Sequence, residues 1–141
     1  IMVCTEPNSV PYGNTFYEGD EIMLGERCYR QYPMGRLAFS GVKCTAGSNT
    51  PTQVDINPIH GVYKAIHRVS VDDVTIYQVL IAYGMNAYKS VGLWNRVGEL
   101  VPGKQASFVL LSKDIIHMDD SQLMDCEIVA TVACGKVMYE R

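Results

Sequence analysis

The chain has 141 residues, which is long enough for one ordinary domain with its own core. Hydrophobic residues make up 48% and charged residues 19%, a composition typical of globular proteins and far from that of disordered ones. The formal net charge of −3 and the lack of any lysine- or arginine-rich run give no electrostatic reason to expect nucleic acid or an anionic membrane as a partner. Apolar runs such as residues 79–82 and 108–111 are far too short to span a bilayer.

Strand and helix patterns alternate in the first part of the chain. Residues 1–5 are apolar and predict a buried strand, and a polar loop is expected through Gly19. A helix is predicted from Asp20 to Pro33, and a short second one over Met34–Phe39. Residues 42–46 predict a further strand that opens into a tight polar loop. In parallel α/β folds, ligand sites gather at such strand ends.

The next two predicted helices have recognisable starts. Asn57 and Pro58 form an N-cap followed by proline at the first helical position, and apolar residues follow at i, i+3, i+4 and i+7. Thr75 and Gln78 form the capping-box pattern T-x-x-Q, which predicts a helix that continues to Gly92.

After Gly92 the pattern becomes all-β. Strands are predicted over residues 106–111 and 128–133, and Cys134–Gly135 predicts a turn into a short hairpin strand. We therefore expect one unit over residues 1–92 and a second over 93–141. A small self-contained α/β or α+β domain fits this order. The end of a (β/α)₈ barrel with an appended β-subdomain fits it too, and periodicity alone does not choose between them.

The cysteines and histidines do not form a recognisable ligand set. The five cysteines are dispersed and contain no CxxC pair, which argues against a disulfide framework and favours five buried thiols in a reducing cytoplasm. His60 and His67 are seven residues apart, whereas zinc-binding pairs on a helix usually stand at i and i+4. With His117 far along the chain, the prediction is three structural or solvent-facing histidines and no metal site.

Several motifs carry a family resemblance. GELVPGKQASFVLL at residues 98–111 resembles the amidohydrolase superfamily signature G-x-L/I-x-P-G-K-x-A-D-F/L-V-V-L, and VACGKVMY at 132–139 is similar to its closing hairpin V-x-x-G-K-V-V-Y. LGER at 24–27, YPM at 32–34 and GSNTP at 47–51 resemble L-G-x-E-R, Y-P-x-R and G-S-D-x-P of family 3, the YtcJ-like branch. These motifs occur in the family's order and spacing.

This resemblance implies an α/β fold: the last strands and helices of a TIM-type (β/α)₈ barrel, followed by a small β-sandwich subdomain. It also implies a metal-dependent hydrolase acting on non-peptide C–N bonds, in which a divalent, zinc-like metal lowers the pKa of bound water. The family's histidine ligands lie on earlier barrel strands, upstream of this sequence. We therefore expect the C-terminal part of such an enzyme, with no metal or cofactor site of its own.

Asn49 stands where the family has its catalytic aspartate. An amide carries no negative charge and cannot act as a base near pH 7, although Asn is also an ordinary turn residue. Asn8 and Arg68 are candidate substrate-binding residues at the barrel rim. Glu6 and Asp55 are interpreted as solvated loop carboxylates.

These features leave three functional hypotheses. The first is the C-terminal piece of an active amidohydrolase, inactive alone, whose partner is the upstream part of the same barrel and whose parent binds a small-molecule substrate. The second is a degenerate amidohydrolase fold with a binding or regulatory role, suggested by Asn49. The third is a self-standing module, for which unpaired strand edges predict self-association.

Overall fold

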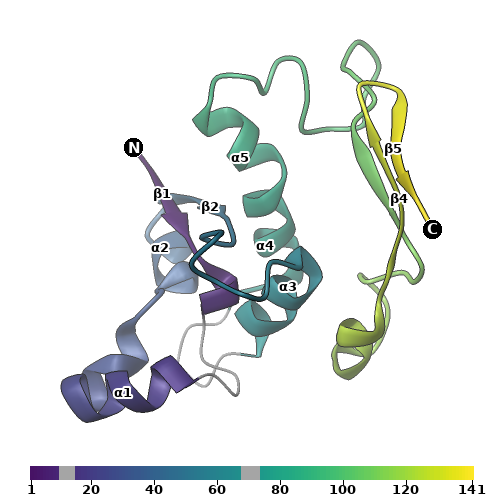
Figure 1. Ribbon diagram of the computed structural model, residues 1–141. Coiled ribbons are helices and arrows are strands. Elements are labelled where there is room, and N and C mark those ends of the chain that lie inside the picture. Colours follow the sequence, from purple (N-terminus) through teal and green to yellow (C-terminus); the bar gives the residue numbers. More distant parts are fainter. Residues whose placement is uncertain (10–14, 68–73) are drawn as a thin grey trace.

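The computed structural model describes residues 1–9, 15–67 and 74–141. A parallel two-stranded sheet lies among the helices of the first part of the chain, and an antiparallel three-stranded sheet stands to one side of them (Figure 1). The structure is thus of mixed α/β type. No helix within the described ranges is long and apolar enough to cross a membrane.

The parallel sheet joins two segments that are distant in sequence. β1 (Met2–Thr5) pairs with β2 (Lys43–Ala46), and the register sets Thr5 opposite Ala46. The backbone N–H of Gly47 donates to the Thr5 carbonyl at 3.0 Å, which continues the pairing past β2. Because the strands are parallel, their carboxyl ends lie at the same edge of the sheet. Both strands match the predicted ranges within one residue.

The connection between the two strands is helical, and its first helix differs from the prediction. After a 3₁₀ turn, η1 (Pro7–Ser9), the helix α1 (Thr15–Leu24) begins within the segment expected to be a loop. It also ends earlier, because Gly25 takes a φ of +57° and the chain continues as the 3₁₀ segment η2 (Gly25–Arg30). Glycine adopts this left-handed conformation without steric cost, so it commonly terminates an α-helix.

The following helices keep their predicted starts. α2 spans Met34–Phe39, as predicted. α3 (Pro58–Ile66) begins where the Asn57 side chain accepts a hydrogen bond from the Ile59 N–H at 3.0 Å. This bond satisfies one of the backbone donors that a helix start leaves without a partner.

The helix that was expected to run through to Gly92 is divided in two. α4 (Ile76–Tyr83) has the complete capping box of Thr75 and Gln78. Gly84 then has φ −99° and ψ −99°, outside the helical region, and α5 (Met85–Ser90) follows as a separate helix. A glycine interrupts a helix at little steric cost, and the apolar periodicity runs through the break.

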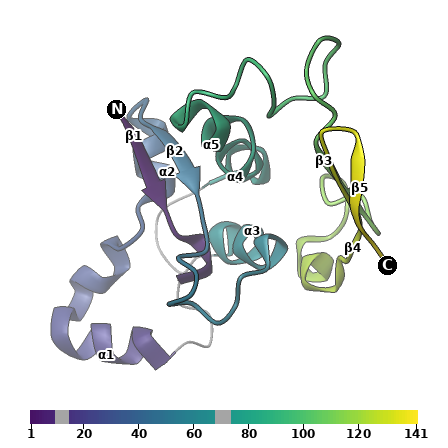
Figure 2. The same cartoon turned by 45° about the horizontal axis from the view of Figure 1, so that its top comes forward.

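Two groups of buried side chains form the core. The first lies between the parallel sheet and helices α2, α3 and α4, and comprises Met34, Cys44, Val62, Ala65, Val79 and Ala82. The second joins α3 to the C-terminal part of the chain and comprises Ile59, Ile115, Leu123 and Cys126. Figure 2 shows α3 between the parallel strands and the C-terminal part, so this helix contributes to both groups.

The C-terminal sheet has the order β3-β4-β5, with β3 (Phe108–Leu111), β4 (Ile128–Ala133) and β5 (Lys136–Glu140). The turn at Cys134 and Gly135 has positive φ at both residues, 51° and 78°, as a type I′ hairpin turn requires. β4 matches the predicted strand. A 3₁₀ segment before it, η3 (Asp120–Asp125), was not expected.

The expectation of five buried cysteines was wrong for two of them. Cys28, Cys44 and Cys126 are buried, whereas Cys4 and Cys134 are exposed; all five are free thiols. Val3 pairs with Cys44, whose side chain faces the helical core, so Cys4 faces the opposite side of the sheet. Cys134 is exposed because it occupies the hairpin turn.

Candidate functional site

The carboxyl ends of β1 and β2 bring two candidate segments to one edge of the parallel sheet. Glu6 directly follows β1, and Asn49 follows β2 after two loop residues. The hydrogen bond between Gly47 and Thr5 keeps the two exits adjacent. Ligand sites of parallel α/β folds form at such an edge, and the site expected here from the sequence stays a prediction.

Asn49 lies in a tight turn at this edge. Its φ is +53°, and its carbonyl accepts backbone hydrogen bonds from Thr52 at 2.9 Å and Gln53 at 3.3 Å. The side chain is exposed. Asn tolerates a left-handed backbone better than most residues, so the conformation explains an asparagine here on local grounds. The amide of Asn49 is also accessible to solvent at this edge.

Asn8 is used inside the protein. Its side chain is 1% exposed; Nδ2 donates to the Asn57 carbonyl at 3.0 Å and Oδ1 accepts from the Tyr83 hydroxyl at 2.9 Å. Its own carbonyl accepts from Lys64 Nζ at 3.0 Å. A substrate-binding role for Asn8 stays a prediction. Arg68, the other candidate, lies outside the described residues.

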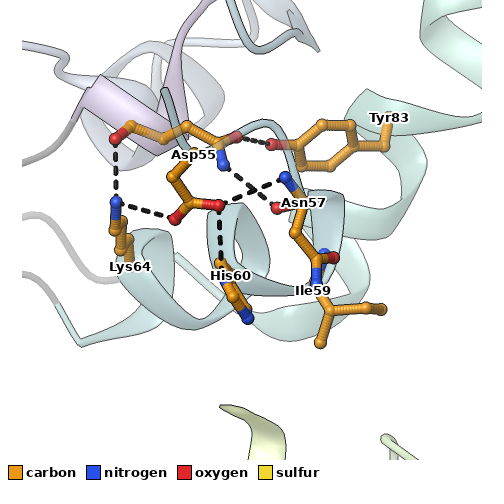
Figure 3. Close-up of polar contacts among 7 residues, drawn as sticks. Asp55, Asn57, Ile59, His60, Lys64 and Tyr83 are labelled. Carbon is orange, nitrogen blue, oxygen red and sulfur yellow. Dashed lines mark hydrogen bonds and ion pairs between the residues drawn. The ribbon is translucent and has the colours of Figure 1, made fainter. Parts of the chain in front are cut away.

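Asp55 is the centre of a polar cluster that the sequence patterns did not predict (Figure 3). Oδ1 accepts from His60 Nδ1 at 3.0 Å and from the Asn57 N–H at 3.2 Å, and Oδ2 forms an ion pair with Lys64 Nζ at 3.2 Å. The Asp55 side chain is 33% exposed and that of Lys64 only 10%. The interpretation of Asp55 as a solvated loop carboxylate is therefore wrong.

A signal for this cluster was present in the sequence. His60 and Lys64 are four residues apart on α3, so they lie on the same face of the helix. Asp55 stands two residues before the Asn57 N-cap, close to the start of that face. The periodicity shows that the two basic side chains are neighbours, but only the path of the loop after β2 brings the carboxylate to them.

The cluster contains two groups whose pKa values differ from their usual ones, Asp55 and Tyr83. Partial burial by itself would raise the pKa of Asp55, but hydrogen bonds from Lys64, the Asn57 N–H and His60 together hold it below its usual value. The pKa of Tyr83 is raised, first by burial and then by the negative charge of Asp55. Tyr83 therefore stays protonated as the donor to Asn8 at physiological pH.

Each of the three histidines has its own partners, and His60 is the one that belongs to the Asp55 cluster. His67 stacks on Tyr63 with ring centroids 4.1 Å apart and has Nδ1 3.0 Å from the Tyr63 carbonyl, while the exposed His117 pairs with Asp114 at 2.8 Å. In the described part of the chain, no group of three or more His, Cys, Asp and Glu side chains is placed to hold a metal ion. Those residues therefore do not by themselves fit the donor set of a catalytic metal.

Two hollows in the surface lie away from Asn49. An open groove of about 500 Å³ runs between the start of α3 and the C-terminal sheet, lined by Asn57, Met124, Cys126, Glu127, Ile128, Thr131, Tyr139 and Arg141. A cavity of about 190 Å³ lies near the amino end of β2 and is lined by residues that include Met34, Lys43 and Asn86.

Comparison with known proteins shows similarity over nearly the whole chain. The model of the amidohydrolase family matches residues 5–139. The putative amidohydrolase YtcJ of Bacillus subtilis (strain 168) is 26% identical over 116 residues, covering 74% of this chain and 22% of that protein. LONG AFTER FAR-RED 3 of Arabidopsis thaliana is 31% identical over 103 residues, covering 66% of this chain and 17% of that protein. The chain spans about a fifth of the length of these curated relatives.

Proposed function

Because the chain belongs to the amidohydrolase family, we propose that it is the C-terminal part of a metal-dependent hydrolase that acts on carbon–nitrogen bonds other than peptide bonds. Members of this family are generally metal-dependent. The match to residues 5–139 supports the family reaction, and the short share of each relative supports a longer functional protein.

The same proposal assigns each of the two sheets to a part of the longer protein. β1 and β2 would be the last two strands of a TIM-type (β/α)₈ barrel within residues 1–92, and β3 to β5 would belong to a small β-sandwich within 93–141. A parallel pair joined by a helical connection supports the first part, since such pairs occur in larger sheets covered by helices. The natural partner would be the upstream part of the same barrel, and a small molecule would be the substrate.

The family match over residues 5–139 is the observation that carries the proposal, and Asn49 is the residue that this chain would contribute at the shared strand edge. When bound, the metal would supply an activated water, but the residues described here do not form its ligand set. What this chain contributes is an amide that can orient a water or a substrate by hydrogen bonding and cannot take up a proton near pH 7. The chain alone is then expected to be inactive.

The test compares this chain with a longer version that includes the upstream barrel strands. The 141-residue chain should not hydrolyse N-acyl substrates and should contain no stoichiometric zinc by metal analysis. The longer protein should hydrolyse these substrates and contain stoichiometric zinc. Stoichiometric zinc in the purified short chain would contradict the proposal, because it would require a ligand set within these residues.

Asn49 also favours a second function, a degenerate amidohydrolase fold kept for binding or regulation. General-base assistance is worth a factor of about 10²–10⁴, so Asn49→Asp in the longer protein should raise hydrolysis by that order if the base alone is missing. A wild-type protein that hydrolyses N-acyl substrates as fast as the Asn49→Asp variant would exclude the degenerate function. A simpler check is whether the upstream strands retain an HxH pair, since its loss would favour the binding or regulatory function.

A cytoplasmic location of the protein stays a prediction.

A further inference from the structure

We propose that the cluster around Asp55 positions the loop that carries Asn49. The cluster, named here the Asp55 clamp, consists of five side chains from four segments of the chain: Asn8, Asp55, His60, Lys64 and Tyr83. These are positioning residues, since their polar atoms bond to one another and to the backbone. The catalytic meaning of the loop rests on the proposed function, but the clamp itself does not.

The loop after β2 is fixed at two points. At its start, the carbonyl of Asn49 holds the N–H groups of Thr52 and Gln53 and closes the turn. At its end, the Asp55 carboxylate holds the Asn57 N–H at 3.2 Å and is itself held by His60 and Lys64 on α3. The stretch between these points is short, so a shift of Asp55 is transmitted to the Asn49 turn.

Lys64 also ties this loop to the other strand. Its Nζ lies 3.2 Å from Asp55 Oδ2 and donates to the Asn8 carbonyl at 3.0 Å. Asn8 in turn donates to the Asn57 carbonyl at 3.0 Å. Because Asn8 follows β1 and Asp55 follows β2, these bonds hold the exits of both strands together at the edge where Asn49 lies.

The clamp is closely packed. A Cβ added at Gly61 would lie 2.1 Å from the Tyr83 hydroxyl oxygen and 2.6 Å from Asn8 Oδ1, so the backbone of α3 touches both groups directly. The Lys64 side chain is 10% exposed and forms its ion pair with the Asp55 carboxylate. Removal of that carboxylate charge leaves a largely buried ammonium without this counter-charge, which favours displacement of the loop.

A clamp of this kind differs from a general stabilising contact in which part of the backbone opens more often when the contact is lost. Loss of the clamp should increase opening of the Asn49 loop and leave the C-terminal sheet closed. A general stabilising contact would instead raise opening everywhere by the same factor. Backbone amide exchange measures both regions at once in the 141-residue chain.

In the Asp55→Asn variant, the amides of Thr52 and Gln53 should exchange at least about tenfold faster than in the wild type, because a charge-assisted anchor of the loop is lost. Those of β4 should be unchanged. The coupling between the amide and α protons of Asn49, which reports its φ, should move away from the value for the left-handed conformation.

Asp114→Asn is the matched control, since Asp114 accepts from His117 Nδ1 at 2.8 Å and from the Ile116 N–H at 3.0 Å but is exposed and belongs to another part of the chain. It should leave the amides of Thr52 and Gln53 unchanged. Lys64→Met, which keeps the apolar stem, should reproduce the effect of Asp55→Asn and serves if that variant does not fold.

Unchanged exchange at Thr52 and Gln53 in both clamp variants would overturn the inference, and so would a uniform increase across β4 or loss of folding in both. The measurement needs neither substrate nor metal. Failure of the clamp is therefore separable from failure of the proposed hydrolase, which is decided by metal content and hydrolysis in the longer protein.

Discussion

Gly61 is the residue at which the packing of α3 leaves no room for a side chain. A Cβ at this position would lie 2.1 Å from the Tyr83 oxygen and 2.6 Å from Asn8 Oδ1. Gly61→Ala should therefore lower the free energy of unfolding by about 1–3 kcal/mol, the usual range for overpacking. Urea denaturation followed by circular dichroism would measure the change.

Gly19→Ala provides the control for that substitution. Gly19 lies within α1 and has no heavy atom within 4 Å of its added Cβ, so alanine should raise the free energy of unfolding by about 0.5–1 kcal/mol through its better helix propensity. If both alanine variants had the same stability, the close approach of Tyr83 and Asn8 to Gly61 would be wrong.

Asp55 should make the stability of the chain depend on pH in the acid range. Its folded-state pKa lies below the ordinary value of 3.8, so the stability it contributes is present above that value and is lost as the pH falls through the folded-state pKa. In Asp55→Asn, the unfolding free energy should fall less steeply on acidification below about pH 5.

Exposed carboxylates need to be controlled in that experiment. Asp114, Glu99 and Asp119 also have lowered pKa values, through hydrogen bonds from His117, Lys104 and the Ser121 N–H respectively, but they lie at the surface. Comparison at high salt screens such pairs. Asp114→Asn should then follow the wild-type curve, and an equal effect of the two variants would contradict the special position of Asp55.

The individual site residues differ in how far the sequence could predict them. The turn at Asn49 follows from local chemistry, and the structure has the left-handed backbone that this chemistry permits. The role of Asp55 could not be predicted in the same way, because its partners His60 and Lys64 are on the next helix. Asn8, which shares Lys64 with Asp55, follows a strand more than forty residues earlier. Only the fold brings these groups together.

At the scale of elements, η3 is attached to α3 by one buried side chain. Leu123 is 0% exposed and packs in the same group as Ile59, Ile115 and Cys126. Leu123→Ala should lower the free energy of unfolding by about 2–5 kcal/mol, because it removes buried methyl groups and leaves a cavity. Its neighbour Met124 is 38% exposed, and Met124→Ala should change stability by less than about 0.5 kcal/mol.

The two variants are compared by chemical denaturation. Equal effects at positions 123 and 124 would show that η3 does not pack on α3. The element boundaries themselves were predicted best where a side chain marks them: Asn57 for α3, Thr75 and Gln78 for α4. The division at Gly84 was not predicted, because the apolar periodicity continues through it. The early start of α1 was not predicted either, because loop-forming residues dominate the sequence before Asp20.

At the scale of the whole molecule, exposed apolar side chains and strand edges favour self-association. β5 is an edge strand of the C-terminal sheet, and its residues Val137, Met138 and Tyr139 are 55%, 62% and 49% exposed. We expect the chain to associate at tens of micromolar, as measured by light scattering. Met138→Lys should reduce the association, because a charge on an edge strand opposes pairing.

Ile22→Lys is the control for the strand-edge mechanism. Ile22 is 84% exposed on α1, so this variant removes a similar apolar side chain without changing an edge. It should associate like the wild type. A monodisperse monomer in the wild type, or an equal effect of the two lysine variants, would contradict association through β5.

The sequence by itself determined the family, the order of the elements and most of their starts. These depend on local chemistry and on motifs a few residues long, such as the Asn57 cap and the PGK segment at residues 102–104. The tertiary structure decided which residues support the edge where Asn49 lies. Asn8, Asp55 and Lys64 come from separate segments, and their hydrogen bonds exist only because the parallel pairing of β1 with β2 and the packing of α3 bring those segments together.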